Sequence, residues 1–303
     1  MGKKIAGLVS VVMSTYKEPK EYVEAAIQSI IDQTHSNFEM VIIIDDPNNR
    51  QVIDLIQNFS KTDSRIRYYI NEKNLGLVNS LNKALGYCTG EYIARMDADD
   101  ISESNRFEEQ LKYLRDHQLD IIGSSFYLFK ENPNSDLVEM KMVSTCKECL
   151  EKLKRNNALA HPSWFGKKEL FDSLDGYRNI LACEDYDFLI RSAEKGARIG
   201  NCPKFLLKYR YNTSGISRSN VEKQLLITAY LAKNFRSGKV ITMEQYTEYV
   251  NSKLFMNECE KMSRVFLRID KRKKESSFLK KLLLIFLIVS SPSFWKYKYI
   301  SKT

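Results

Sequence analysis

The sequence predicts an α/β fold in which a mostly parallel sheet is covered by helices on both faces. Short apolar, β-branched runs alternate with segments of helical period through the first 130 residues. These runs are continuously apolar, as strands of buried parallel sheets are. Polar clusters directly follow three of them, and in open α/β sheets the carboxyl ends of the strands bound the ligand crevice.

Each predicted strand is a short apolar run bounded by polar or turn-forming residues. The predicted strands comprise residues 8–13, 38–44, 66–70, 92–96 and 121–129. Between them apolar residues recur at helical spacing, as Tyr22, Ala26 and Ile30 do. The predicted helices comprise residues 21–33, 52–59, 77–88 and 105–117. This alternation favours βαβ units over an all-β or all-α fold.

The second half of the chain is less regular, and residues 130–156 are polar without a clear period. A strand, a helix and an extended segment are expected at residues 158–165, 184–195 and 198–211. Residues 220–270 have a helical pattern with weak boundaries. We therefore predict an α/β domain over residues 1–217 and a helical C-terminal region over residues 218–303.

Positive charge is concentrated in the last third of the chain. The net charge is +9, and residues 201–303 alone hold 21 Lys and Arg against 7 Asp and Glu, a net charge of +14. Hydrophobic residues are 43% and charged residues 28% of the chain, which excludes a mainly disordered chain, a collagen and a polytopic membrane protein. The asymmetry indicates an anionic partner, either nucleic acid or lipid head groups.

The tail at residues 271–303 has the composition of a membrane-surface segment. Lysine-rich clusters precede an apolar run at 282–289, and Trp295 follows it. Eight helical residues extend about 12 Å, less than the roughly 30 Å of hydrocarbon in a bilayer, so the run is too short to span. It can lie in the interface with the lysines on anionic lipid. The alternative is an ordinary core helix with a basic rim.

The cysteines do not predict a metal or disulfide framework. Cys146 and Cys149 form a single CxxC pair among six scattered cysteines, and the chain has only three His. A structural zinc site needs four such ligands. Because the N-terminus also has no secretion signal, we expect reduced thiols in a cytosolic protein.

Carboxylates dominate the polar clusters at the strand ends. Asp97-Ala98-Asp99 places two acids with i, i+2 spacing after the strand at 92–96. Hard divalent cations take oxygen ligands and can keep positions open for phosphate oxygens, so such a pair can hold a metal ion that bridges a diphosphate. The alternative is an acidic turn in which Asp99 or Asp100 caps the next helix.

Four motifs together resemble family 2 glycosyltransferases, most closely bacterial enzymes that build capsule, O-antigen or related surface polysaccharides. The motifs are SVVMSTYKE at 10–18, IIIDD at 42–46, GEYIARMDADD at 90–100 and EDYD at 184–187. Their order and approximate spacing match the family over roughly residues 6–217. The resemblance implies a GT-A fold, with a nucleotide-binding half at about 1–100 and an acceptor half at about 101–217. It also implies a nucleotide-sugar donor, Mn²⁺ or Mg²⁺ as cofactor, and inversion at the anomeric carbon.

The resemblance also assigns roles to individual residues. Nucleoside or ribose contacts are implied for Thr15, Tyr16, Glu18, Asp45, Asp46 and Asp97. Asp99 is implied as the metal ligand, with Asp97 as a second candidate for that role. Asp185 matches the catalytic base, which takes the proton from the acceptor hydroxyl. Asp187 is the alternative base, and Glu184 is a further candidate site residue. An acidic helix start is also favourable on electrostatic grounds alone.

The chain departs from the family pattern at several positions. Pro47 and Asn48 stand where Gly-Ser is common, and Leu81 stands where many members carry Arg. Asn212, a weaker and neutral oxygen ligand, stands where a metal-binding His is common. The sequence has no QxxRW signature, which argues against a processive synthase.

For three arginines and one histidine the sequence leaves two readings open. Arg95, Arg106 and Arg210 could contact phosphate or pair with nearby acids. His161 could contact the acceptor or pack in the core.

These inferences favour an inverting glycosyltransferase peripheral to the inner face of a bacterial cell membrane. UDP is the expected nucleotide, a lipid-linked saccharide or growing polysaccharide the expected acceptor, and an anionic membrane surface a further partner. We expect no nucleic-acid partner, and a homo-oligomer is compatible with the sequence. The main alternative is a nucleic-acid- or membrane-binding protein without catalysis that uses the basic C-terminus. A nucleotidyltransferase would need a Gly-rich loop after the first strand, whereas residues 14–19 contain no Gly.

Overall fold

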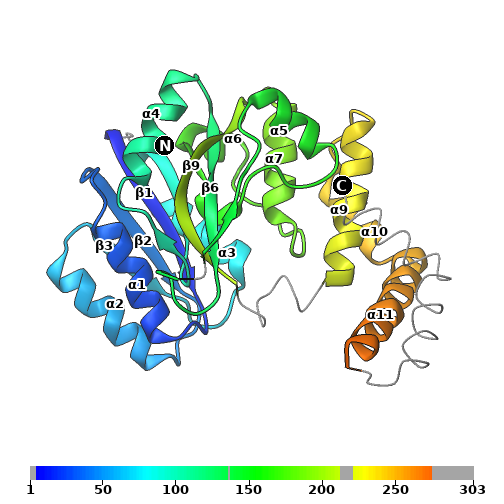
Figure 1. The fold of residues 1–303 in the computed structure, drawn as a ribbon, viewed down its shortest axis with the longest axis horizontal. Helices are drawn as coiled ribbons and strands as arrows, with labels where there is room; N and C mark the ends of the chain where they lie inside the picture. The colour runs from blue at the N-terminus through cyan, green and yellow to red at the C-terminus, as the bar shows by residue number, and fades with distance from the viewer. Residues whose placement is uncertain (1–4, 136, 212–220, 275–303) are drawn as a thin grey trace. The chain divides into compact units, whose positions relative to one another are not determined.

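The computed structural model describes residues 5–135, 137–211 and 221–274 (Figure 1). The chain forms two compact units. Unit 1 comprises Met1–Lys152, Asn157–Asn179 and Phe188–Asn212, and unit 2 comprises Leu153–Asn156, Ile180–Asp187 and Thr213–Thr303. Unit 2 therefore takes two short segments from within the α/β domain predicted over residues 1–217.

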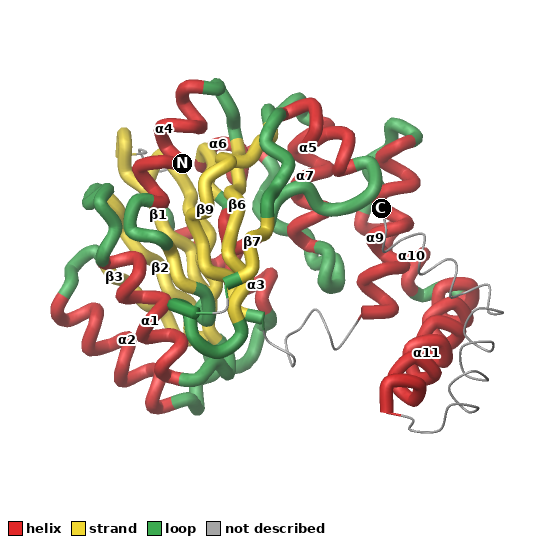
Figure 2. Tube along the Cα trace, in the orientation of Figure 1, coloured by secondary structure: helices red, strands yellow, loops and turns green. Residues whose placement is uncertain are grey.

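Unit 1 is built on a nine-stranded, mixed sheet with the order β3-β2-β1-β4-β8-β6-β9-β5, and β7 pairs with β6. Figure 2 shows the strands of this sheet in yellow and the helices in red. The strands are β1 (Ile5–Thr15), β2 (Phe38–Ile44), β3 (Ile66–Ile70), β4 (Gly90–Asp97), β5 (Ile101–Ser102), β6 (Ile121–Phe129), β7 (Val138–Met140), β8 (Phe165–Lys167) and β9 (Ile199–Arg210). The pairs among β1 to β4 are parallel, and β8 joins β4 to β6 by antiparallel pairing. The predicted α/β class with a mostly parallel sheet is confirmed.

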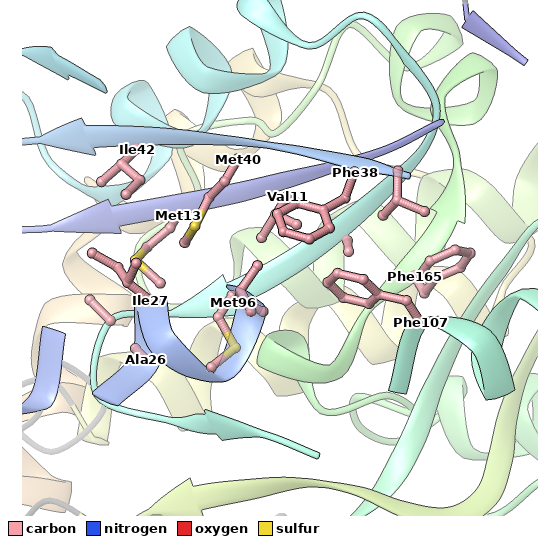
Figure 3. Close-up of a cluster of buried hydrophobic side chains, with 14 of the residues drawn as sticks. Val11, Met13, Ala26, Ile27, Phe38, Met40, Ile42, Met96, Phe107 and Phe165 are labelled. Atoms are coloured by element: carbon pink, nitrogen blue, oxygen red, sulfur yellow. The ribbon is translucent and has the colours of Figure 1, made fainter. Parts of the chain in front are cut away.

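Helices cover both faces of this sheet. Those of the first half are α1 (Lys20–Ile31), α2 (Arg50–Thr62), α3 (Leu77–Tyr87) and α4 (Arg106–Asp116). Residues of α1, α2 and α4 join one core cluster with alternate residues of β1, β2 and β4 (Figure 3). Helix α3 packs against β1 and β2, and its buried residues Val78, Leu81 and Ala84 lie outside that cluster.

The core cluster shows why the strands are apolar on both faces. Val11 and Met13 of β1 pack with Met40 and Ile42 of β2 and with Ile27 of α1 (Figure 3). The intervening residues Val12, Val41 and Ile43 are equally buried. Because both faces of β1 and β2 are buried, their sequences read as continuous apolar runs.

The strand predicted at 158–165 is wrong over most of its length. His161–Ser163 form the 3-10 helix η1, with Pro162 inside its first turn, and β8 begins only at Phe165. Ala158 and Leu159 are buried without pairing in the sheet, so their apolar character reflects burial alone. The polar stretch at 130–156 contains β7 and α5 (Cys146–Leu153).

The remaining helices are α6 (Lys168–Ser173), α7 (Glu184–Glu194), α9 (Val221–Arg236), α10 (Met243–Val250) and α11 (Lys253–Lys274). Of these, α6 was not predicted, whereas the others correspond to the helical segments predicted at 184–195 and 220–270. In unit 2 the rings of Tyr230 and Tyr249 stack at 3.9 Å and join α9 to α10. Thr242 and Gln245 form a capping box that starts α10, which explains why this short helix forms.

Among the described residues, none of the helices combines the length and apolar character that crossing a bilayer requires. Two expectations fall outside the described residues. They are the role of Asn212 and the membrane contact of the tail beyond Lys274.

Candidate active site

Strand β1 lies at the point where the sheet order reverses, between β2 and β4. In the ladder Thr15 of β1 pairs with Ile44, the residue before Asp45, and Ser14 of β1 pairs with Asp97. Three of the predicted polar clusters therefore meet at one edge of the sheet in unit 1. A reversal of strand order is where open α/β sheets bind ligands.

Glu18 shapes the turn that follows β1. Its Oε2 accepts a hydrogen bond from Thr15 Oγ1 at 2.7 Å and from the backbone N–H of Tyr16 at 2.7 Å. Thr15 is buried, and Glu18 is half-buried. The carboxylate of Glu18 thus holds the first predicted nucleoside segment in place.

The carboxylate of Asp45 is buried and accepts hydrogen bonds from other residues of the chain. Its Oδ1 accepts from Asn71 Nδ2 at 2.7 Å and from the N–H of Leu75 at 2.8 Å, and its Oδ2 accepts from the N–H of Gly76 at 2.9 Å. Asp46 is more open, and its Oδ1 accepts from the N–H of Asn48 at 3.0 Å. Of the two acids, Asp46 is therefore the more accessible to a ligand.

Three carboxylates gather after β4. Ligand atoms of Asp97, Asp99 and Asp100 lie within 4.8 Å of one another. Burial, with the charges of Asp97 and Glu18, raises the pKa of Asp99 to about 7. Burial, with the charges of Asp97 and Asp99, raises the pKa of Asp100 well above its usual value. Among the described residues, Asp100 Oδ2 is buried without a hydrogen-bond partner.

This group, which we call the aspartate group, fits a divalent cation. It offers hard oxygen ligands from the end of β4 and the turn that follows it, the donor set that Mg²⁺ and Mn²⁺ prefer. The raised pKa values of Asp99 and Asp100 reflect burial first and repulsion by neighbouring acids second, and a bound cation would offset both effects. Asp100 was not predicted as a ligand, although its place as the third acid of the DADD run was a signal in the sequence.

Two buried arginines flank the aspartate group. Arg95 forms an ion pair with Asp97, and although burial opposes its charge, Asp97 holds the pKa of Arg95 above its usual value. Arg210 donates through Nε to the carbonyl of Asp99 at 2.9 Å and through its backbone N–H to Asp100 Oδ1 at 2.8 Å. Its guanidinium carbon lies 3.7 Å from the ring centroid of Tyr22, so Arg210 braces the turn from within.

Arg106 and His161 are buried and contact other groups of the protein interior. Arg106 is fully buried and donates to the carbonyls of Arg95 and Trp164 at 2.8 Å and 3.2 Å. His161 is buried, and its Nε2 lies 2.9 Å from the hydroxyl of Tyr177. Burial and the charge of Arg95 lower the pKa of His161 well below its usual value, so this imidazole is neutral.

The predicted base lies in unit 2. Glu184, Asp185 and Asp187 form the acidic first turn of α7, where the helix dipole favours negative charge. Asp185 is half-buried and its Oδ1 accepts from the N–H of Tyr186 at 2.6 Å, whereas Asp187 is fully buried. A base must reach an acceptor hydroxyl, and the greater exposure of Asp185 suits that task.

Comparison with known proteins identifies relatives of the whole α/β region. Residues 10–174 match the family model of glycosyl transferase family 2. The chain is 35% identical over 241 residues to a glycosyltransferase of Methanocaldococcus jannaschii, covering 79% of this chain and 83% of the relative. It is 29% identical to the O-antigen biosynthesis glycosyltransferase WbnJ of Escherichia coli (80% and 94% covered). It is also 26% identical to a UDP-Gal:α-D-GlcNAc-diphosphoundecaprenol β-1,3-galactosyltransferase of Escherichia coli (82% and 90% covered).

Solved structures share the fold at low sequence identity. The structure of S. aureus TarS residues 1–349 with UDP-GlcNAc matches with a TM-score of 0.61 and 15% identity over 93% of this chain and 81% of that chain. A mannosyltransferase of Pyrobaculum calidifontis with GDP-Man and Mn²⁺ matches with a TM-score of 0.60 and 17% identity (96% and 84% covered). The fold of these glycosyltransferases is therefore the fold of this chain.

Proposed function

Since the chain belongs to glycosyl transferase family 2 and is thus a glycosyltransferase, we propose that it moves a sugar from a nucleotide-sugar donor to a lipid-linked or growing polysaccharide acceptor, with inversion at the anomeric carbon. The observation that carries the proposal is the aspartate group at the carboxyl end of β4, beside the reversal of strand order at β1. A group of acids there suits a metal-bound diphosphate rather than a free anion.

The donor nucleoside would lie against the ends of β1 and β2. Thr15 and Tyr16 form the turn that Glu18 holds, and Asp46 has a carboxylate oxygen available for a base N–H. UDP is the nucleotide we propose, in line with the UDP-Gal named for one relative.

The donor diphosphate would lie at the aspartate group. Asp99 and Asp100 would hold Mn²⁺ or Mg²⁺, and Asp97 would face the ribose or the sugar. A divalent ion there stabilises the negative charge that develops on the leaving diphosphate. The buried Arg210 keeps the turn in shape through the carbonyl of Asp99, so the carboxylates need little rearrangement when a ligand arrives.

Asp185 would act as the base of a single displacement. It would accept the proton from the acceptor hydroxyl as that oxygen attacks the anomeric carbon from the side opposite the leaving nucleotide. One displacement inverts the configuration. Glu184 and Asp187 would interact with the positive end of the helix dipole of α7 rather than contact the acceptor.

The acceptor would be a saccharide on a lipid carrier at the inner face of a bacterial membrane. Two relatives are named for O-antigen synthesis and for a diphosphoundecaprenol acceptor, and the basic, apolar tail suits such a surface. Peripheral attachment would bring the acceptor and the catalytic residues together.

A donor screen tests the proposal. The full-length protein would be incubated with Mn²⁺ and each of a panel of UDP- and GDP-sugars, and release of the nucleotide diphosphate measured. We expect one donor class to be hydrolysed in a metal-dependent manner, and NMR of the product with an acceptor to show inversion. Release that persists in EDTA, or retention of configuration, would contradict the mechanism.

A further inference from the structure

Arg95 and Asp97 form an ion pair on one face of β4. They are two residues apart in a strand, so their side chains project to the same side of the sheet. Nη2 of Arg95 pairs with Oδ1 of Asp97, and the Asp97 side chain is 30% exposed whereas that of Arg95 is 4% exposed. The ion pair thus runs from the protein interior to the aspartate group.

Arg95 is held in place and keeps its charge. Its backbone N–H donates to the carbonyl of Trp164 at 2.9 Å, and its Nε and Nη1 are buried without a hydrogen-bond partner among the described residues. A guanidinium does not lose its proton in proteins. A buried cation with unsatisfied donors is expensive, so its ion pair with Asp97 is its main compensation.

Arg95 also differs from Arg210 in what it contacts. Arg210 binds the carbonyls of Asp99 and Glu131 through its side chain and braces the backbone of the turn. In the described part of the chain, Arg95 is the cation that forms an ion pair with a carboxylate of the aspartate group. Its charge therefore opposes binding of a second cation there.

We propose that Arg95 is a positioning residue that holds Asp97 as its counter-ion while the site is empty, directs that carboxylate toward the donor, and weakens binding of a divalent ion in the absence of the donor. The inference rests on the metal role in the proposed function. Because Arg95 neutralises the charge of Asp97, the empty site attracts a divalent ion less strongly. The donor diphosphate supplies the missing negative charge, so the ion and the donor bind together.

Binding of Mn²⁺ alone tests the proposal without any need for the donor. The full-length protein, free of nucleotide, would be titrated with Mn²⁺ and free ion followed by EPR. We expect Arg95→Met to bind Mn²⁺ about tenfold more tightly than the wild type, because a nearby unit charge of the same sign is removed. Turnover should fall in the same variant. Simple loss of structure would not produce tighter Mn²⁺ binding together with lower turnover.

Matched variants separate charge from structure. Arg95→Lys keeps the charge and should bind Mn²⁺ within about twofold of the wild type. Arg115→Met removes an exposed arginine of α4, which donates to the Tyr92 hydroxyl at 3.3 Å, and should leave Mn²⁺ binding unchanged.

A double variant keeps the test decisive if Arg95→Met does not fold. Replacing a buried ion pair by neutral residues is often tolerated, so Arg95→Met with Asp97→Asn should fold. It should bind Mn²⁺ within about twofold of the wild type, because one positive and one negative charge are removed together. If Asp97 instead ligates the ion, the double variant will bind clearly more weakly, and that result overturns the proposal.

Failure of this inference can be told apart from failure of the proposed function. If neither the wild type nor the Arg95 variants bind Mn²⁺, the metal role fails and this inference fails with it. If the wild type binds Mn²⁺ and Arg95→Met binds it equally or more weakly, the metal role stands and only the role of Arg95 is overturned.

Discussion

Asp45 accepts a hydrogen bond from Asn71 at 2.7 Å although the two residues belong to different strand ends. The same carboxylate binds the N–H groups of Leu75 and Gly76, and Gly76 has a φ of +81°, which favours glycine. Lys83 Nζ in turn donates to Asn71 Oδ1 at 2.7 Å. Asp45 thus fixes the loop that leads into α3, beside the proposed nucleoside site.

Asp45→Asn should destabilise the protein by about 2 kcal/mol, because an amide N–H would face a buried N–H donor. Urea unfolding followed by circular dichroism measures this free energy. Asp46→Asn is the matched control, since Asp46 is more exposed and receives one backbone N–H at the turn, and it should be close to neutral. Equal losses in the two variants would show that the loop does not depend on Asp45.

Asp99→Asn should lower kcat by about 100-fold or more and weaken Mn²⁺ binding while the melting temperature is retained. Because the pKa of Asp99 is raised to about 7, protons compete with the ion, and Mn²⁺ affinity in the wild type should increase as the pH rises through that value. Asp116→Asn, an exposed acid of α4, serves as the control. Full activity of Asp99→Asn would remove the metal role.

Asp185→Asn should retain donor and Mn²⁺ affinity but lose turnover, since the amide cannot accept the acceptor proton. Calorimetry with the donor product and single-turnover kinetics separate the two effects. The fully buried Asp187 provides the comparison: if Asp187→Asn abolishes turnover and Asp185→Asn does not, the base is misassigned.

His161 should make the protein sensitive to acid. Burial and Arg95 lower its folded-state pKa, so below about pH 6.5 the unfolded chain binds a proton that the folded chain does not. Stability should therefore fall as the pH decreases, by about 1.4 kcal/mol per pH unit from this residue. His161→Gln should flatten the dependence, whereas His117→Gln, at an exposed position, should preserve it. An unchanged slope in His161→Gln would contradict this account.

Removal of residues 271–303 should release the protein from vesicles that contain anionic lipid, because it deletes the basic clusters and the apolar run. Co-sedimentation at low and high salt measures the binding, and donor hydrolysis checks that the shortened chain is active. A wild-type chain that stays in the supernatant with such vesicles would refute membrane attachment.

The sequence by itself determined the order of strands and helices along most of the α/β region and the location of polar clusters at the ends of β1, β2 and β4. These properties follow from local period and composition, because a strand buried on both faces must be apolar throughout and a helix must repeat its apolar residues every three or four positions. The error at 158–165 arose because burial without strand pairing produces the same apolar run.

Only the tertiary structure decided which partners the acids and arginines of the candidate site contact. Three sets of contacts depend on the strand order or on the directions of side chains. They are the hydrogen bonds of Asp45 with Asn71 and Gly76, the ion pair of Arg95 with Asp97 and the hydrogen bond of Arg210 to Asp99. Local sequence does not predict which carboxylate will have a hydrogen-bond or ion-pair partner, since that depends on which strands become neighbours. The sequence therefore predicted that acids follow β1, β2 and β4, whereas their contacts became visible only in the tertiary structure.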